Sequence, residues 1–248
     1  MTKLNLFKAK WKSSNPQIRE EAVKSLKDIA ALADIAENDE YPFVRKAAIN
    51  SLIWPLHSDI ITKVAINDDD ASVRKSAIEK VKDSVILMYI ILKEPDEDNR
   101  LTAVENIKST EILARLGKNN TACDYARQLA VSKIQDEEIL GEIANQTSSY
   151  IVYSKAIDKI KQKSVLIHII ENSVSYGARN YARNVLINIS TCHKCKSSCA
   201  IYYCKSCNIS ICKKCIQEKH SLKFQSELYC PECNKLIDNK LYRNYFEE

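Results

Sequence analysis

The chain has very few of the residues that bend or interrupt a helix. Its 248 residues include only three glycines and five prolines. Sheet-rich and loop-rich folds need many more turn residues, so this scarcity predicts an all-α protein. Long apolar runs are also missing: the longest, Val85–Leu92, has eight residues, whereas roughly 20 are needed to span a bilayer. The first twelve residues lack the apolar core of a secretory signal. We therefore expect an intracellular, cytoplasmic protein with no membrane contact.

A single unit is repeated along most of the chain. Its marker is an alanine that recurs at intervals of 26 to 29 residues, followed four positions later by an aliphatic residue. The alanines are Ala22, Ala48, Ala77, Ala103, Ala130, Ala156 and Ala182, and the aliphatic residues are Leu26, Leu52, Val81, Ile107, Ile134, Ile160 and Leu186. Residues four apart share one face of a helix, so each copy presents the same buried stripe.

Each copy is predicted to contain two short helices. A polar break such as Lys82-Asp83-Ser84 supplies capping residues, and a second apolar stretch such as ILARL from Ile112 follows it. A helix pair of this size cannot bury its apolar face alone, whereas stacked pairs share a continuous core. The sequence therefore predicts an α-solenoid of about seven helix pairs.

Segments of the repeat resemble the second helix of short HEAT-type repeats. The resemblance rests on VRKAAINSL from Val44, SVRKSAIEKV from Ser72 and ARQLAVSKI from Ala126, and it covers roughly residues 5–190. The period is shorter than the usual HEAT unit and approaches the related leucine-rich-repeat variant. Either family implies an α-solenoid.

An arginine precedes the repeated alanine by three positions in every copy except the sixth, where Tyr153 stands. The arginines are Arg19, Arg45, Arg74, Arg100, Arg127 and Arg179. In HEAT-like stacks such an arginine pairs with an acidic residue or a helix end of the adjacent repeat. A row of ligand-binding arginines is the alternative. Arginine near a helix start opposes the helix dipole, so an acidic partner is expected, and Glu20, Asp70 and Asp98 are near in sequence.

Nine of the ten cysteines lie between Cys192 and Cys233. Without an export signal, such a cluster indicates a metal site rather than a disulfide framework. Eight of them form four CxxC pairs, and Zn²⁺ takes four thiolates in a tetrahedron, so the pairs predict two closed Cys₄ sites. The four-residue gap after Cys207 is too tight for neighbouring pairs to share one ion, which favours an interleaved arrangement. The predicted ligands are Cys192, Cys195, Cys212 and Cys215 for the first zinc, and Cys204, Cys207, Cys230 and Cys233 for the second.

Alternatives to this ligand set remain open. His220 is a candidate to displace one cysteine of the last pair, and Cys199 is a further possible ligand. An iron–sulfur cluster is the second choice of metal group, because four thiolates also suit it. We accordingly predict a repeat domain over residues 1–190 and a zinc-binding domain over residues 191–248.

The interleaved spacing resembles the cross-brace zinc fingers, namely FYVE, RING and B-box domains. The segment YCKSCNISICKKC from Tyr203 matches FYVE and B-box patterns, and ICKKCIQEKH is especially B-box-like because of the place of His220. The uncharged stretch Ala200–Tyr203 lacks the basic motif that FYVE domains use for phosphoinositides. A RING-type histidine between the second and third pairs is also missing. The resemblance therefore implies a protein-interaction role more than lipid binding or ubiquitin transfer.

Charge and histidine content narrow the function further. The formal net charge is +5, and residues 191–248 carry +4 of it, which eight thiolates and two Zn²⁺ would cancel. We expect His57 and His168 to be buried, satisfied histidines and Cys123 to be a small packing residue, and the three do not form a recognisable catalytic set. Closed Cys₄ sites leave no open position for substrate. We expect a non-enzymatic, monomeric scaffold for a protein partner, whose zinc domain caps the solenoid or adds a binding surface. The alternatives are a nucleic-acid-binding HEAT-like protein and a ubiquitin-ligase-like zinc finger protein.

Overall fold

The computed structural model describes residues 10–190 continuously. Beyond them it describes only residues 202–204, 209–211, 217–220, 226–229, 232 and 235. The molecule divides into two compact units, Met1–Ile134 and Gln135–Glu248. This division lies inside the repeat, and the predicted boundary after residue 190 stays a prediction.

Residues 10–190 form thirteen α-helices after one short 3₁₀ helix, η1 (Lys10–Lys12). The helices of the first unit are α1 (Pro16–Val23), α2 (Ile29–Asn38), α3 (Pro42–Ser51), α4 (Ser58–Asn67), α5 (Ala71–Ile78), α6 (Ser84–Lys93), α7 (Glu97–Asn106), α8 (Thr110–Lys118) and α9 (Asp124–Lys133). Those of the second unit are α10 (Glu137–Gln146), α11 (Tyr150–Ile157), α12 (Lys163–Asn172) and α13 (Tyr176–Ile189). The all-helical prediction is confirmed for these residues.

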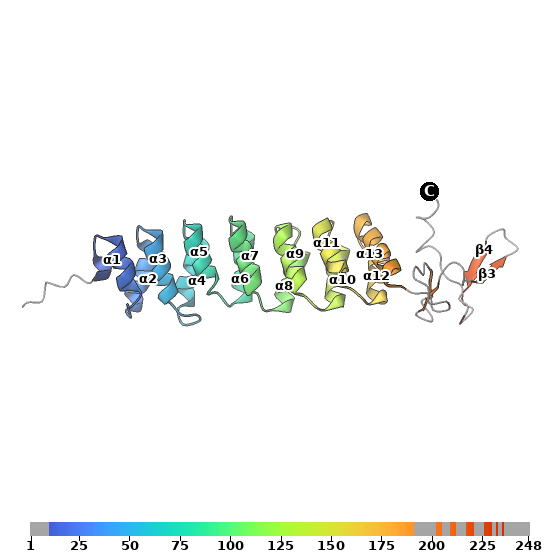
Figure 1. The fold of residues 1–248 in the computed structure, drawn as a ribbon, viewed down its shortest axis with the longest axis horizontal. Helices are drawn as coiled ribbons and strands as arrows, with labels where there is room; N and C mark the ends of the chain where they lie inside the picture. The colour runs from blue at the N-terminus through green and yellow to red at the C-terminus, as the bar shows by residue number, and fades with distance from the viewer. Residues whose placement is uncertain are drawn as a thin grey trace, which may run out of the picture. The chain divides into compact units, whose positions relative to one another are not determined.

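The helices of the first unit form two layers, visible in Figure 1. The odd-numbered helices α1 to α9 pack side by side in one layer, and α2, α4, α6 and α8 pack side by side in the other. Consecutive helices such as α2 and α3, or α4 and α5, also pack on each other and form the repeated pair. This helical-repeat arrangement is compatible with a solenoid. The described residues hold seven odd-numbered helices but six even-numbered ones, because none precedes α1.

The second unit repeats the same packing and adds two short strand pairs. Helix α10 packs on α11 and α12, and α13 packs on α11 and α12. Strands β1 (Tyr202–Cys204) and β2 (Ile209–Ile211) are antiparallel, with Cys204 opposite Ile209. Strands β3 (Gln217–His220) and β4 (Ser226–Tyr229) are also antiparallel, with His220 opposite Ser226.

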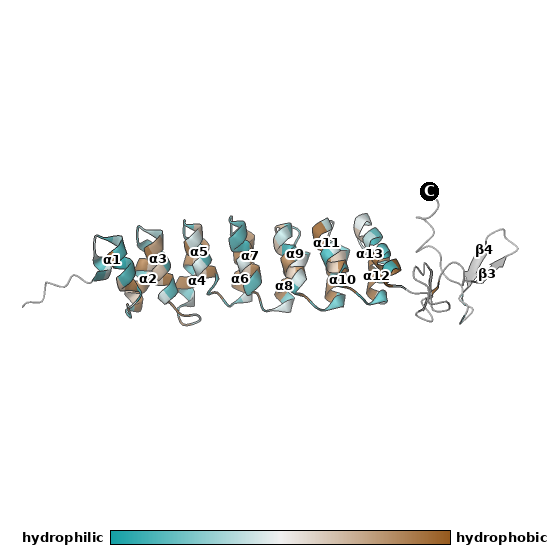
Figure 2. Ribbon diagram, viewed as in Figure 1, coloured by the Kyte–Doolittle hydropathy of each residue, from teal (hydrophilic) through white to brown (hydrophobic). Residues whose placement is uncertain are grey.

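The repeated alanine is the centre of the core. All copies from Ala48 to Ala182 are fully buried, and the aliphatic residues that follow them are at most 2% exposed. Ala22 and Leu26 of the first copy are only half-buried, because α1 is the first odd-numbered helix in the described part of the chain. Figure 2 shows hydrophobic and hydrophilic residues within the same helices, as is expected of helices with one buried and one exposed side.

Short polar side chains start most even-numbered helices. The side-chain oxygens of Asp28, Asp83, Ser109 and Asp136 accept hydrogen bonds from backbone N–H groups of the first helical turn. This satisfies donors that have no partner inside the helix. The one long interval, 29 residues, comes from a longer connection between α3 and α4, where His57 Nδ1 accepts from the Ile53 backbone N–H at 2.9 Å.

Candidate functional site

The repeated arginines form a ladder of ion pairs in the first unit. Each of the first three reaches a carboxylate at the C-terminal cap of the even-numbered helix that follows it. The pairs are Arg19–Asp39, Arg45–Asp68 and Arg74–Glu94, each with a shortest N–O distance of 2.7 Å. The expected pairing between repeats is confirmed for these three. The partners are not Glu20, Asp70 or Asp98, because the helix caps lie nearer in space.

The same arginines also bind the backbone. In five copies Nη1 donates to the carbonyl oxygen six residues earlier, at the end of the preceding segment or helix. The pairs are Arg19 to Ser13, Arg45 to Asp39, Arg74 to Asp68, Arg100 to Glu94 and Arg179 to Ser173. The cap residues of α2, α4 and α6 are thus held twice, through the side chain and through the carbonyl. These guanidinium groups serve the fold and are not free to bind a ligand.

After Glu94 the arginines of the ladder no longer pair with a carboxylate at the cap of an even-numbered helix within the described residues. Arg100 has no acidic partner in the part of the chain that the structure describes, and its Nε is buried there without a hydrogen bond. Arg127 is 2% exposed and instead donates to Asp124, to Asn120 and to the carbonyl of Gly117. Tyr153 replaces the arginine of the sixth copy and lies in an edge-on cluster with Tyr150 and Tyr181.

The ion pairs shift the pKa values of their members. Hydrogen bonding to Asp39 raises the pKa of Arg19, and Asp68 and Glu94 do the same for Arg45 and Arg74. Burial alone would raise the pKa of Asp39, but hydrogen bonds from Arg19 and the Tyr41 backbone N–H outweigh it and lower that pKa. The carboxylate is therefore held in its charged form.

A second row of polar contacts closes the other ends of the odd-numbered helices. Side chains near the end of one helix donate to the last carbonyl groups of the previous one in the same layer. The donors are Ser51 to Val23, Lys80 to Asn50 and Leu52, Asn106 to Ile78, and Lys133 to Val104, Glu105 and Ile107. Burial lowers the pKa of Lys80 and of Lys133.

These contacts bear on the lysines that a nucleic acid would need. Lys80 is held by carbonyl groups, Lys82 donates to the Glu79 carbonyl, and Lys24 pairs with Glu20 and Glu21. The sequence offers five repeat lysines as a possible basic face, namely Lys24, Lys46, Lys75, Lys80 and Lys82. Of these, only Lys46 and Lys75 have no such partner within the described residues. The sequence pattern alone did not distinguish the two groups.

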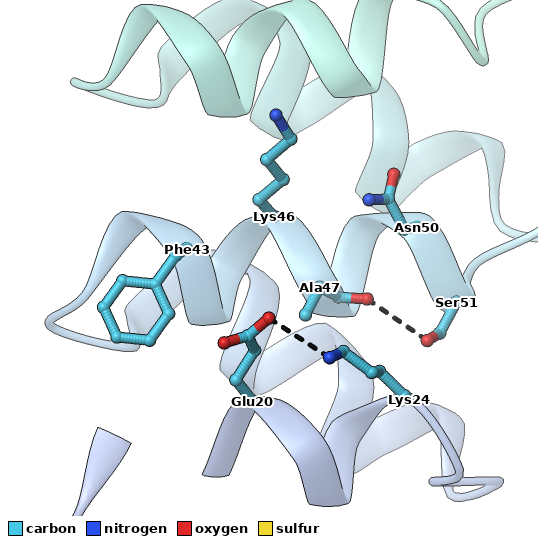
Figure 3. A pocket seen from close by; sticks show the side chains of 7 residues that line it. All are labelled: Glu20, Lys24, Phe43, Lys46, Ala47, Asn50 and Ser51. Carbon is cyan, nitrogen blue, oxygen red and sulfur yellow. Dashed lines mark hydrogen bonds and ion pairs between the residues drawn. The ribbon is translucent and has the colours of Figure 1, made fainter. Parts of the chain in front are cut away.

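A hollow of about 360 Å³ lies on the odd-numbered layer between α1 and α3. Its walls are lined by Glu20, Lys24, Phe43, Lys46, Ala47, Asn50 and Ser51. Figure 3 shows Glu20 on α1 and Lys24 at the C-terminal cap of α1 facing Ala47 on α3, with Phe43 at one side and Ser51 at the other. The small Ala47 leaves the space open, and Phe43 contributes an aromatic ring that is 37% exposed.

The polar groups of the hollow differ in how they are satisfied. Glu20 and Lys24 neutralise each other at 3.3 Å, and the hydrogen bonds that Lys24 donates to Glu21 and Glu20 raise the pKa of Lys24. Ser51 donates to the Ala47 carbonyl at 3.1 Å. The Lys46 ammonium and the Asn50 amide have no partner in the part of the chain that the structure describes. The hollow therefore offers one ring, one free cation and one free amide.

The predicted zinc ligands lie almost entirely outside the described residues. Only the backbones of Cys204, at the end of β1, and His220, at the end of β3, are described. The positions outside the description are Cys192, Cys195, Cys199, Cys207, Cys212, Cys215, Cys230 and Cys233. No group of three or more His, Cys, Asp or Glu suited to a metal occurs among the described residues. The zinc sites stay a prediction from the spacing.

The remaining reactive side chains are dispersed. His57 is 9% exposed and bound within its own loop, which confirms its expected burial. His168 is exposed on α12 and contacts Asn172, so the expectation that it is buried is wrong: it lies on the outer side of its helix. Cys123 caps α9, is half-buried and makes no side-chain cap bond. None of the described hydrogen bonds joins two of these residues.

Comparison with protein families, curated proteins and solved structures finds no match for this chain. No described helix has the length and apolar character needed to cross a bilayer. Sequence reasoning missed the hollow, because it depends on the small residue at Ala47 between two particular copies. It also missed the acidic caps, although a carboxylate 20 to 23 residues after each of the first three arginines was a readable signal.

Proposed function

We propose that this protein is a non-enzymatic, cytoplasmic scaffold that binds a protein partner. The body is an α-solenoid of the short HEAT type, and residues 191–248 form a two-zinc domain that caps it or adds a second surface. The hollow between α1 and α3 supports this function most directly. Its volume is at the lower end of ligand sites, which span about 300–1,000 Å³.

The chemistry of the hollow fits an extended peptide segment. The Phe43 ring can pack against an apolar side chain, and the Asn50 amide offers both a donor and an acceptor to peptide groups. Lys46 supplies the free positive charge, which selects a carboxylate. The segment that best fits is thus an acidic peptide with one apolar residue. Three of the five repeat lysines considered above are bound within the fold, which argues against nucleic acid, because its binding requires several unpaired cations along one face.

The test is selection of a random peptide library on the full-length protein, followed by anisotropy measurements with the enriched peptides. We expect acidic sequences with an apolar residue, and we expect Lys46→Ala and Asn50→Ala each to weaken binding. Lys75→Ala is the matched control, because Lys75 occupies the same place in α5 but does not line the hollow. Equal weakening by Lys75→Ala would contradict the assignment of this site. Tight, salt-sensitive DNA or RNA binding without any peptide binding, or ubiquitin transfer with conjugating enzymes, would overturn the scaffold function itself.

A further inference from the structure

Helix α6 is exceptional among the even-numbered helices on its outward side. Val85, Tyr89 and Leu92 occupy its second, sixth and ninth positions and are 63%, 50% and 42% exposed. The other even-numbered helices carry an alanine or a polar residue at the second position and polar residues at the sixth. Those residues are Ala30, Asp59, Glu111, Glu138 and Ser164 at the second position, and Asp34, Lys63, Arg115, Glu142 and His168 at the sixth.

Packing of the repeat does not require this apolar stripe. The inward side of α6 is already filled by Leu87, Ile90 and Ile91, which are at most 3% exposed. The other copies fold with charged or small residues at the outward positions, so the repeat itself supplies the comparison. A helix that is apolar on both sides is normally covered on both. The exposed stripe therefore marks a surface that another molecule covers.

The charged residues on the two helices beside the apolar stripe differ in sign between the second and the sixth helix position. Helices α4 and α8 pack on either side of α6. Asp59 and Glu111 stand at the position of Val85, whereas Lys63 and Arg115 stand at the position of Tyr89. Asp59, Glu111 and Arg115 have no partner within the described residues, and Lys63 pairs with Glu37 at 2.5 Å. The unpaired charges beside the stripe are thus negative near the start of α6, at Asp59 and Glu111, and positive at Arg115 beside its middle and at Lys93 at its end, whereas Glu37 balances the charge of Lys63.

We propose that this surface binds an amphipathic helix of a partner protein, antiparallel to α6. Helices carry acidic residues in the first turn and basic residues in the last, which complements their dipole. An antiparallel helix would bring its acidic first turn to the unpaired cations Arg115 and Lys93. Its basic last turn would then meet Asp59 and Glu111. Its apolar face would cover Val85, Tyr89 and Leu92, in the manner of a helix bound along a groove.

A second copy of this chain fits the surface less well. If two copies pair through antiparallel α6 helices, Lys63 faces Lys63 and Arg115 faces Arg115. If the two α6 helices are parallel, Asp59 faces Glu111 and Lys63 faces Arg115. Both two-fold arrangements place like charges together, which disfavours association. The charge pattern therefore favours a different helix as the occupant.

The test uses two synthetic helical peptides with the same leucine seam and opposite charge order. One peptide has an acidic first turn and a basic last turn, and the other has the two turns exchanged. Anisotropy with the full-length protein is expected to show about tenfold tighter binding of the first peptide, since each flanking surface pair contributes modestly. Tyr89→Lys, which installs the residue of α4 at the same position, is expected to abolish this binding. Tyr125→Lys changes an exposed tyrosine on the other layer and is expected to leave it intact.

Each other result overturns the proposal. Equal binding of the two peptides, or binding unaffected by Tyr89→Lys, would remove the specific role of the stripe. Self-association that Tyr89→Lys abolishes would assign the surface to a second copy, and vesicle binding that it abolishes would assign it to lipid. Circular dichroism of Tyr89→Lys verifies that the variant is folded. The hollow lies on the other layer, between α1 and α3, so Lys46→Ala is expected to leave this peptide bound.

Discussion

Replacing Arg74 by methionine tests whether the arginine ladder holds the repeats together. Arg74 Nε and Nη2 donate to Glu94 at distances from 2.7 to 3.2 Å. Its Nη1 donates to the carbonyl groups of Asp68 and Asp69. The side chains of Arg74 and Glu94 are 9% and 2% exposed, respectively. Methionine preserves much of the volume and removes every one of these bonds.

The expected cost follows from what is left behind. Glu94 would remain buried with an uncompensated charge, and removal of one partner of a buried ion pair costs about 3–5 kcal/mol. Arg100→Met is the matched control, because Arg100 has the same place in α7 but only its carbonyl contacts, with Glu94 and Pro95. Losing those bonds costs about 1–2 kcal/mol. The two variants should therefore differ by roughly 2–3 kcal/mol.

Urea unfolding followed by circular dichroism at 222 nm measures both free energies of unfolding. Hydrogen exchange of α5 and α6 locates the loss within the first unit. The double variant Arg74→Met/Glu94→Gln removes the orphaned charge, so its cost should be less than the sum of the single costs by about 1–3 kcal/mol. If Arg74→Met costs no more than Arg100→Met, or if the two changes are additive, the ion pair does not stabilise the stack.

Three further changes test other parts of the structure. Asp39 has a lowered pKa, so its stabilising effect is complete above the ordinary carboxyl pKa of about 4 and is lost as the pH falls through its pKa in the folded protein. The free energies of unfolding of the wild type and of Asp39→Asn, measured by urea titration, should therefore converge in acid. Hydrogen bonding to Asp158 raises the pKa of Tyr181 to about 12, so stability present below about pH 10 should decline between pH 10 and 12, and Tyr181→Phe should decline less. Ala103→Leu should lower the free energy of unfolding by about 1–3 kcal/mol, because Ala103 is fully buried. An unchanged melting temperature would show that Ala103 is not tightly packed.

The predicted metal sites have their own test. Elemental analysis of the purified protein should find about two zinc ions per chain, and its absorption spectrum should show no band in the visible range. Cys212→Ser should reduce the zinc content, while the helical signal of α1 to α9 persists, since repeat stability is largely between nearest neighbours. Iron with a brown chromophore would replace the zinc interpretation by a cluster, and a uniform loss of helix signal would contradict the independence of the two regions.

The helical body was readable from the sequence because each copy repeats the same packing requirement. Ala103 and Ile107, four residues apart, are both fully buried, as the shared helix face predicts. Asp83 and Ser109 cap α6 and α8 at the predicted polar breaks. The partner of each arginine was harder to predict. Asp39, for example, is 20 residues from Arg19 in sequence, and the two side chains meet only because all of α2, which lies between them in the sequence, packs beside α1.

The candidate sites were not readable in the same way, because they depend on departures from the repeat. At the sixth position of the even-numbered helices the sequence changes from Lys63 to Tyr89 to Arg115 while the buried positions stay apolar. The repeat pattern identifies the buried positions, but it gives no information about which of the variable outward positions matter for binding. Once the structure separates the two sets, a variation that packing does not explain becomes informative. Tyr89 is then the residue whose replacement by the corresponding lysine of α4 distinguishes a binding surface from an ordinary exposed helix face.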